Sequence, residues 1–351
     1  MIASQPRAWG EAAGSGRLRS RPADFRVEEV LGFEPEGDGE HCFLYIEKTG
    51  LSTAEVAQRL ARHAGVPRSG VGYSGLKDRQ AVTRQWFSVG PVGRSEPDWS
   101  ALEREGELRL LASHRHRRKL RRGVHRANRF ELVLRDLSAT AESLTPRITQ
   151  IAEQGVPNYF GPQRFGRGGS TLTQGRQWLA DGQPRIKRDR RSLYLSALRA
   201  SLFNTLLGLR VTDGSWNRVL AGDACALHGT RSLFTCELPD ADIEARCAAH
   251  DLHPALPLWG EGEPIASIER HRDQYLALAD SSVIADALEN LGMSLSYRSA
   301  RLFPDDFCWE FCDDGVLKLD FSLGAGSYAT AVVAELLNFS EGDAGSGYSG
   351  E

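Results

Sequence analysis

The sequence lacks the features that identify several common classes of protein. None of its six cysteines forms a CxxC pair and its nine histidines form no spaced cluster, so it predicts no metal site. We expect the cysteines to be free thiols, most of them buried. No apolar run reaches about 18 residues, so no membrane span is expected. The first residues lack the apolar core of a signal peptide, which predicts a cytoplasmic protein.

A phosphate-binding loop is also missing. The pattern GxxxxGK[ST] needs a lysine directly after its second glycine and a hydroxyl residue next. Here Leu76 separates Gly75 from Lys77, and the next residue is Asp78, whose carboxylate would repel a phosphate. We therefore expect no nucleotide cofactor, and a nucleotide-hydrolysing enzyme is disfavoured.

Charge is distributed unevenly along the 351 residues, a length that predicts two domains. The net charge is -3, yet residues 114–129 carry eight lysines and arginines and no acid. This basic segment connects two predicted strands, 108–112 and 129–137, and predicts a local contact with a polyanion. A solvated charged loop is the alternative. The candidate phosphate contacts are Arg115, Arg117, Arg118, Lys119, Arg121 and Arg122.

The most informative stretch is GYSGLKDRQAVTRQ at 72–85. Two glycines permit a tight turn, which presents Asp78 between Lys77 and Arg79. Neighbouring cations favour the ionised carboxylate, and an ionised carboxylate on a rigid turn suits a nucleophile. Alternatively, Asp78 is a structural residue that caps the turn and pairs with Arg79 or Arg84.

Hydrophobic periodicity predicts alternating strands and helices. Ser52 and Glu55 form a capping-box pattern at the start of a helix over 53–64. A second helix is expected to begin at Thr145 and Pro146 and to end near Gly155. Other predicted elements are a strand at 40–50, a strand at 85–89, a helix at 191–209 with Leu195, Leu198, Leu202, Leu206 and Leu209 on one stripe, a hairpin of 307–311 and 316–321 around Asp313-Asp314-Gly315, and a flexible tail at 341–351.

Several long segments resemble the TruD family of tRNA pseudouridine synthases in the expected order. They are SGLKDRQAVTRQWFSV around Asp78, GRLRSRPADFRVEEVLGFEPEGDGEH at 16–41, RANRFELVLR at 126–135, GVPNYFGPQRFGRGG at 155–169, RRSLYLSALRASLFN at 190–204 and GAGSYATAVVAELLN at 324–338. The resemblance implies an isomerase that converts uridine 13 of tRNA to pseudouridine without a cofactor. Its partner is tRNA, and no membrane or nucleotide takes part.

The resemblance also implies roles for individual residues. Asp78 matches the catalytic aspartate, either as a nucleophile at the sugar C1′ or as the stabiliser of a cation-like C1′. Phe25, Asn128 and Phe130 match residues that bind the flipped base. Tyr328 matches a substrate-binding ring that is commonly phenylalanine in the family. Arg19 falls where the family has a basic residue near the aspartate, and we expect it, with Lys77, to support Asp78.

The predicted fold class is α+β. A pseudouridine synthase catalytic domain with a mixed, mainly antiparallel sheet is expected from residues 1–154 and 299–340, with an α/β domain inserted at 155–298. The rival function is a non-catalytic RNA-binding or tRNA-chaperone module, which would share the basic segment and have no need of Asp78.

Overall fold

The computed structural model describes residues 5–93, 96–312 and 315–341. These residues divide into two compact units: unit 1 holds 5–12, 146–303 and 328–336, and unit 2 holds 13–145, 304–327 and 337–341 apart from the gaps. The predicted domain boundaries stay a prediction, and the structure groups residues 146–154 with most of the predicted insertion. The predicted tail beyond Glu341 and the turn residues Asp313 and Asp314 lie outside the described residues.

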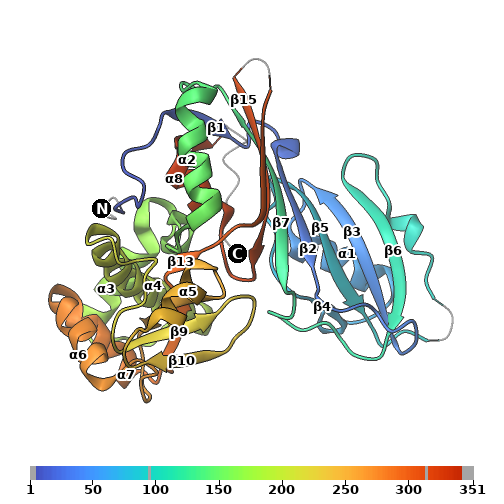
Figure 1. The fold of residues 1–351 in the computed structure, drawn as a ribbon. Helices are drawn as coiled ribbons and strands as arrows, with labels where there is room; N and C mark the ends of the chain where they lie inside the picture. The colour runs from blue at the N-terminus through green and yellow to red at the C-terminus, as the bar shows by residue number, and fades with distance from the viewer. Residues whose placement is uncertain (1–4, 94–95, 313–314, 342–351) are drawn as a thin grey trace. The chain divides into compact units, whose positions relative to one another are not determined.

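Unit 2 is built on a mixed sheet of ten described strands (Figure 1). Its order is β14-β15-β7-β2-β5-β3-β6, while β1 pairs with β7 and β16, and β4 pairs with β5. The strands are β1 (Ser15–Leu18), β2 (Phe25–Val30), β3 (His41–Thr49), β4 (Val71–Tyr73), β5 (Val82–Val89), β6 (Leu108–His116), β7 (Ala127–Arg135), β14 (Asp305–Cys312), β15 (Val316–Gly324) and β16 (Asn338–Glu341). The β2–β5 and β1–β16 pairs are parallel and the others are antiparallel. The predicted α+β class with a mixed, mainly antiparallel sheet is therefore confirmed.

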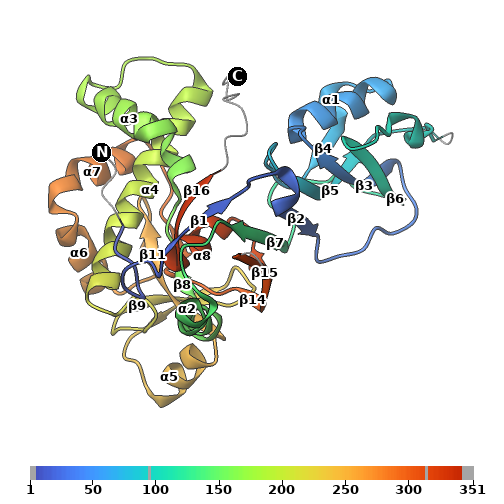
Figure 2. The same ribbon diagram turned by 90° about the horizontal axis from the view of Figure 1, so that it is seen from above.

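Helix α1 (Thr53–His63) covers one face of this sheet beside β4 and β5 (Figure 2). Its predicted capping box is confirmed, because Glu55 N donates to Ser52 Oγ at 3.2 Å and Ser52 N donates to Glu55 Oε2 at 2.7 Å. Val56 and Leu60 project from the apolar face of α1 into a core shared with β3 and β5. Unit 2 also contains the short 3-10 helices η1 (Pro22–Asp24), η2 (Arg68–Gly70) and η3 (Trp99–Leu102).

Unit 1 combines helices with a separate antiparallel sheet of order β10-β9-β11-β12. The strands of that sheet are β9 (Asp223–Leu227), β10 (Leu233–Cys236), β11 (Leu252–Leu258) and β12 (Ser296–Ser299). Two further strands of unit 1, β8 (Val156–Pro157) and β13 (Arg301–Leu302), pair with each other. Its helices are α3 (Ser170–Ala180), α4 (Arg188–Thr212), α5 (Ala241–Ala248), α6 (Ile268–Ala277), α7 (Ser282–Asn290) and α8 (Ala329–Leu336), with η4 (Pro162–Phe165), η5 (Arg167–Gly169) and η6 (Ala279–Ser281). The long helix α4 packs against α3, α7 and β11, and most of its leucines lie in the core of the unit: Leu195, Leu198, Leu202, Leu206 and Leu207. Leu209, predicted on the buried stripe, is exposed.

Helix α2 (Ala141–Gln154) begins five residues before Pro146, its predicted first residue. Thr140 is the residue that caps it: Thr140 Oγ1 accepts from Ser143 N at 3.3 Å, and Thr140 O accepts from Leu144 N at 3.1 Å. Pro146 consequently lies inside the helix, where the sequence had suggested its first residue. The prediction was wrong because a second hydroxyl residue competes with Thr145 as the cap.

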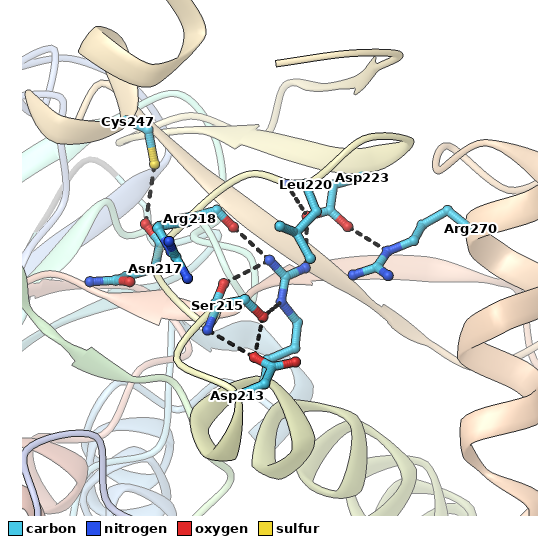
Figure 3. Close-up of polar contacts among 9 residues, drawn as sticks. Asp213, Ser215, Asn217, Arg218, Leu220, Asp223, Cys247 and Arg270 are labelled. Carbon is cyan, nitrogen blue, oxygen red and sulfur yellow. Dashed lines mark hydrogen bonds and ion pairs between the residues drawn. The ribbon is translucent and has the colours of Figure 1, made fainter. Parts of the chain in front are cut away.

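A buried ionic network ties the end of α4 to β9 in unit 1 (Figure 3). Arg210 Nη1 lies 2.7 Å from Asp223 Oδ2, and Arg270 Nε lies 2.8 Å from Asp223 Oδ1. Leu220 N donates to Asp223 Oδ2 as well. Arg210 uses its other donors on Ser215 and on the Arg218 carbonyl. Every side-chain nitrogen of Arg210 and both carboxylate oxygens of Asp223 therefore have a hydrogen-bond partner.

The described residues contain six free cysteines, of which four are buried, Cys308 is exposed and Cys312 is intermediate. They contain no cluster of histidine, cysteine and acidic side chains that could hold a metal ion. Within the same ranges, no helix combines the length and the apolar character that crossing a membrane requires.

Candidate active site

The turn that carries Asp78 connects β4 to β5 in unit 2 and depends on a close approach at Gly72. A Cβ at Gly72 would lie 2.3 Å from the Leu120 carbonyl and 2.6 Å from Ser88 Oγ. Only glycine therefore fits there, and the reason is space and not a left-handed backbone. The Asp78 turn also lies beside the basic segment, because Ser74 O accepts from Gly123 N at 2.8 Å.

Buried polar groups fix the backbone of the turn to the connection between β3 and α1. Lys48 Nζ donates to Leu51 O at 2.7 Å and to Asp78 O at 3.0 Å. Burial lowers the pKa of Lys48 to about 8, and the nearby charge of Asp78 opposes the shift. Arg79 exchanges backbone and side-chain hydrogen bonds with Gly50 at 3.1 and 2.8 Å. The main chain on both sides of the Asp78 side chain is thus held in place.

The Asp78 carboxylate is paired with Arg19, which follows β1. Arg19 Nη2 donates to Asp78 Oδ2 at 2.8 Å, and the side chains are 15% and 51% exposed respectively. The other arm of Arg19 contacts Glu341 at 3.1 Å. Arg19 has a φ of 59°, a left-handed conformation that side-chain-bearing residues seldom adopt and that persists where the surroundings enforce it. The carboxylate is therefore accessible and oriented by a fixed cation.

Aromatic rings continue from Arg19 across β2, β7 and β15. The Arg19 guanidinium lies 3.9 Å from the centre of the Phe25 ring, and Phe25 meets Phe130 edge-to-face at 6.2 Å. Phe130 in turn stacks on Phe321 at 5.7 Å. The strand register causes this, since Phe25 and Phe130 project from the same face of adjacent strands. Their exposures are only 3% and 6%, so the rings form the floor of the candidate site.

Lys77 does not contact Asp78 but forms a buried ion pair with Glu29. Lys77 Nζ lies 3.1 Å from Glu29 Oε2, with side-chain exposures of 6% and 0%. Glu29 Oε1 accepts from Trp86 N at 3.2 Å. Burial raises the pKa of Glu29, and the Lys77 charge opposes the shift. The cation that contacts Asp78 is Arg19, whereas the neighbouring Lys77 compensates a buried acid.

Asn128 lies on the same face as Phe130 and is linked to the Asp78 turn through His125. His125 Nδ1 lies 2.6 Å from Ser74 Oγ, and His125 Nε2 lies 3.4 Å from the amide of Asn128. Burial and the charge of Lys77 lower the pKa of His125 to about 4, so the ring is neutral near pH 7. His125 lies within the basic segment by sequence, and the structure gives it a partly buried polar contact with Ser74.

Tyr328 belongs to unit 1, and its contacts lie within that unit. Its hydroxyl accepts from Arg164 Nη2 at 2.8 Å, and Arg164 Nη1 donates to Ser196 Oγ at 3.0 Å. The Arg298 guanidinium covers the Phe160 ring at 4.4 Å. Burial lowers the pKa of Arg298 to about 10, and Arg164 adds to the shift. The Tyr328 hydroxyl, which distinguishes this residue from phenylalanine, thus has a cationic partner.

The basic segment is partly compensated by acids from other parts of unit 2. Arg117 forms a two-pronged pair with Asp38 at 2.9 Å, and Arg115 lies 3.4 Å from Glu96. Lys119 donates to the Ser69 carbonyl, and Arg122 donates to Tyr73 at 2.9 Å. Arg118 and Arg121 are exposed, with no ion pair to any described residue. Acids that lie far away in the sequence therefore neutralise part of the charge of the basic segment.

The sequence reasoning missed Glu29, Lys48 and Ser74. The sequence pattern indicates two of them. Glu29 alternates with Phe25 and Val27 onto the same buried face of β2, and Lys48 lies on the same face of β3 as buried residues. An ionisable residue on the apolar parity of a strand marks a buried charge that needs a partner. Ser74 gives no such signal, because its role depends on a residue 51 positions away.

Comparisons with known proteins agree along nearly the whole chain. A family model described as tRNA pseudouridine synthase D (TruD) matches residues 5–181 and 170–336. Curated relatives include tRNA pseudouridine synthase D of Methylococcus capsulatus, 48% identical over 95% of this chain and 94% of that protein, and of Pseudomonas fluorescens, 43% identical over the same shares. A crystal structure of the putative tRNA pseudouridine synthase D from Methanosarcina mazei has a TM-score of 0.71, 19% identity and 96% coverage of each chain, and it supports the fold.

Proposed function

The chain belongs to the tRNA pseudouridine synthase D family, and we propose that it isomerises uridine 13 of tRNA to pseudouridine with Asp78 as the catalytic nucleophile. In this reaction the N1–C1′ bond of uridine breaks and a C5–C1′ bond forms. The C5 proton leaves and N1 gains a proton, so atoms and electrons balance without a co-reactant. The proposal therefore includes no cofactor and no nucleotide.

One observation carries the proposal: an accessible carboxylate is held by a guanidinium on a turn whose backbone is fixed by buried groups. Asp78 Oδ2 contacts Arg19 at 2.8 Å, while Asp78 O accepts from the buried Lys48. A nucleophile with a fixed position loses little freedom on reaching the transition state. A carboxylate with only a structural role would be expected to have both oxygens satisfied, whereas only Asp78 Oδ2 contacts a described partner.

The base is proposed to bind beside Asp78 against Phe25, Asn128 and Phe130. Arg19 contacts both Phe25 and the Asp78 carboxylate. His125 contacts both Asn128 and Ser74, which belongs to the Asp78 turn. A flipped base needs an apolar surface and hydrogen bonds to its edge, which these residues supply. Tyr328 is proposed as a further substrate contact on the basis of the family resemblance, with Arg164 holding its hydroxyl.

The RNA backbone is proposed to contact the basic segment, and the protein is proposed to act in the cytoplasm. Phosphate contacts supply most of the affinity for a folded RNA. Arg118 and Arg121 are the strongest candidates because they are exposed and no described acid pairs with them. Arg115, Arg117, Lys119 and Arg122 also engage protein groups, so their contribution to RNA binding is expected to be smaller.

The decisive experiment compares Asp78→Ala with the wild type on a tRNA transcript containing uridine 13. Pseudouridine is measured by tritium release from uridine labelled at C5, and tRNA binding is measured separately. We expect binding to persist and product to vanish in the variant.

Asp320→Ala is the matched control, since Asp320 is a partly exposed aspartate of the same unit paired with Arg129 at 2.7 Å. It should retain activity. Product formed by the Asp78→Ala protein would overturn the mechanism. Product that persists in a transcript with cytidine at position 13 would overturn the site assignment. A wild type that binds tRNA and forms no product would support the rival binding module.

A further inference from the structure

The hydrogen bonds around His125 determine which of its two neutral tautomers is present. The backbone N–H of His125 donates to Ser74 Oγ at 2.8 Å, and the same oxygen lies 2.6 Å from His125 Nδ1. Ser74 is buried, and no other described atom accepts a hydrogen bond from its hydroxyl. If Nδ1 carried the proton, the Ser74 O–H would be left buried without an acceptor, which is costly. The Ser74 O–H therefore donates to Nδ1, and the ring proton lies on Nε2.

This tautomer places an N–H opposite the side-chain amide of Asn128. Asn128 Nδ2 lies 3.4 Å from His125 Nε2, so two donors would face each other. At the same time Asn128 Oδ1 is buried and has no hydrogen-bond partner among the described residues. Both conflicts disappear when the amide is turned by half a rotation. Oδ1 then accepts from His125 Nε2–H, and the NH2 group takes the buried position at which no described residue donates to Oδ1.

We infer that Ser74 and His125 lock the Asn128 amide so that it presents an NH2 donor to a carbonyl oxygen of the target uracil. This inference rests on the proposed function, because it identifies the substrate of that NH2 group. Asn128 is 8% exposed and shares its strand face with Phe130, part of the proposed base pocket. No described residue donates to the position that the NH2 group takes after the turn, as suits a donor there, and uracil offers carbonyl acceptors at O2 and O4. The alternative orientation would present a carbonyl that accepts from uracil N3–H.

Ser74 and His125 are positioning residues in this arrangement, since neither is proposed to touch the base. Burial, reinforced by the charge of Lys77, lowers the pKa of His125, so the neutral tautomer is retained near neutral pH. A protonated imidazolium would donate from both nitrogens and would lose the hydrogen bond from the Ser74 hydroxyl. The neutral ring therefore connects the turn of Asp78 to the amide that reads the base.

The first test is independent of catalysis and reads the tautomer directly. Long-range proton–nitrogen NMR of the full-length protein labelled with 15N distinguishes the Nε2–H from the Nδ1–H form, and comparison with His125→Leu assigns the signal. His253 is an internal reference, because Arg301 Nε donates to its Nδ1 at 2.8 Å and requires the same Nε2–H tautomer. We expect Nε2–H at His125 and loss of this pattern in Ser74→Ala. An Nδ1–H ring in the wild type would overturn the inference.

The second test asks what the Asn128 amide presents to the base. Asn128→Asp keeps the shape and can still accept from His125, but it replaces the NH2 donor with an acceptor. We expect kcat/KM to fall at least a hundredfold with little change in tRNA affinity. Replacing one uracil carbonyl with sulfur, a weaker acceptor, should lower wild-type kcat/KM about tenfold at either position 2 or position 4. That penalty should vanish in Asn128→Ala.

The positioning role predicts a graded effect at His125. His125→Leu should lower kcat/KM about tenfold, and His125→Gln, whose amide can donate to Asn128 Oδ1, should recover part of the loss. An Asn128→Asp enzyme as active as the wild type would overturn the donor role while leaving the proposed function intact. A wild type that forms no pseudouridine would overturn the proposed function and the role at the base, and the NMR test would still decide the tautomer.

Discussion

Two buried ion pairs, Arg210–Asp223 in unit 1 and Lys77–Glu29 in unit 2, differ in how fully their hydrogen bonds are satisfied. In unit 1, Asp223 accepts from Arg210, Arg270 and Leu220 N, and Arg210 donates to four acceptors. In unit 2, Glu29 accepts one bond from Lys77 and one from Trp86 N, both above 3 Å. Arg19 Nε and one polar atom of the Asn128 amide, in the same unit, are also buried without a partner among the described residues.

This difference indicates which arrangement serves stability and which serves a site. A fully satisfied network rigidifies a core and leaves nothing for a ligand, whereas unused donors and acceptors beside a buried charge remain available to one. The Arg210 network links α4 to β9 and contains no exposed reactive group. Lys77 of the Glu29–Lys77 pair directly precedes Asp78 in the chain, and the carboxylate of Asp78 is accessible. The contrast predicts separable effects on stability and on activity.

The largest stability loss is expected for Arg210→Met. The change leaves the buried Asp223 with reduced compensation and removes the donors to two carbonyls, which should cost about 3–5 kcal/mol. Denaturant unfolding and hydrogen exchange of β9 measure the loss. Arg270→Met is the matched control, because Arg270 is more exposed and contributes one contact to Asp223, so its loss should be smaller. Equal losses would contradict the saturated-network interpretation.

Glu335 sharpens the comparison because main-chain amides donate to its buried carboxylate, while the charges of Arg7 and Arg147 only partly oppose the effect of burial. Its carboxylate accepts from Ala8 N and Trp9 N, and burial raises its pKa to about 7. The folded state therefore binds a proton that the unfolded state, with a pKa near 4.5, has released. Stability should fall as pH rises from about 4.5 to about 7, by about 3 kcal/mol in total.

Thermal unfolding as a function of pH tests this sign. Glu335→Gln keeps the hydrogen-bond acceptor and cannot ionise, so its stability should lack the decline that the wild type shows over this range. A wild-type stability that rises between pH 5 and 7, with the slope abolished by Glu335→Gln, would show that Glu335 is ionised in the folded state.

Lys77→Met should cost about 2 kcal/mol, less than Arg210→Met, because Glu29 can take up a proton when its cation is lost. The loss of stability should grow with rising pH. Without Lys77 the buried Glu29 keeps its proton in the folded state, whereas the unfolded state releases it. Adding Glu29→Gln should restore stability, because the Trp86 N–H still finds an acceptor. If Lys77 positions Asp78 and His125, activity should be low in Lys77→Met and should stay low when Glu29→Gln is added. Recovery of activity together with stability would make the pair purely structural.

The sequence predicted local elements well where one residue type determines the outcome. The Ser52–Glu55 capping box and the alternating strands β3 and β7 follow from nearest-neighbour chemistry. The start of α2 was missed because Thr140 and Thr145 are both competent caps and only the remaining structure selects between them.

The candidate site was predictable in its residues and not in its connections. Arg19 and Asp78 were both identified, and the structure shows them 2.8 Å apart. The pairing of Lys77 with Glu29 and that of Ser74 with His125 join segments about 50 residues apart, so no local pattern encodes them. The acids that neutralise Arg115 and Arg117 were missed for the same reason, since charge counting within a segment ignores what the sheet brings beside it.

The smallest stability effects are expected in the basic segment, where the same contrast recurs at the surface. Arg117 is paired with Asp38 and Glu36, whereas Arg118 and Arg121 are exposed without an ion pair to any described residue. Replacing any of the three by alanine should leave stability almost unchanged, because exposed ion pairs contribute little to it.

Their effects on tRNA binding should differ. The dependence of log affinity on log salt should weaken by about one for each of Arg118→Ala and Arg121→Ala, because each releases a counterion on binding phosphate. Arg117→Ala should change this slope less, since Asp38 already neutralises its guanidinium and the carboxylate would have to be displaced first. Fluorescence anisotropy with labelled tRNA over a range of salt concentrations measures all three slopes. Equal slopes would show that pairing with Asp38 does not reduce the contact of Arg117 with RNA.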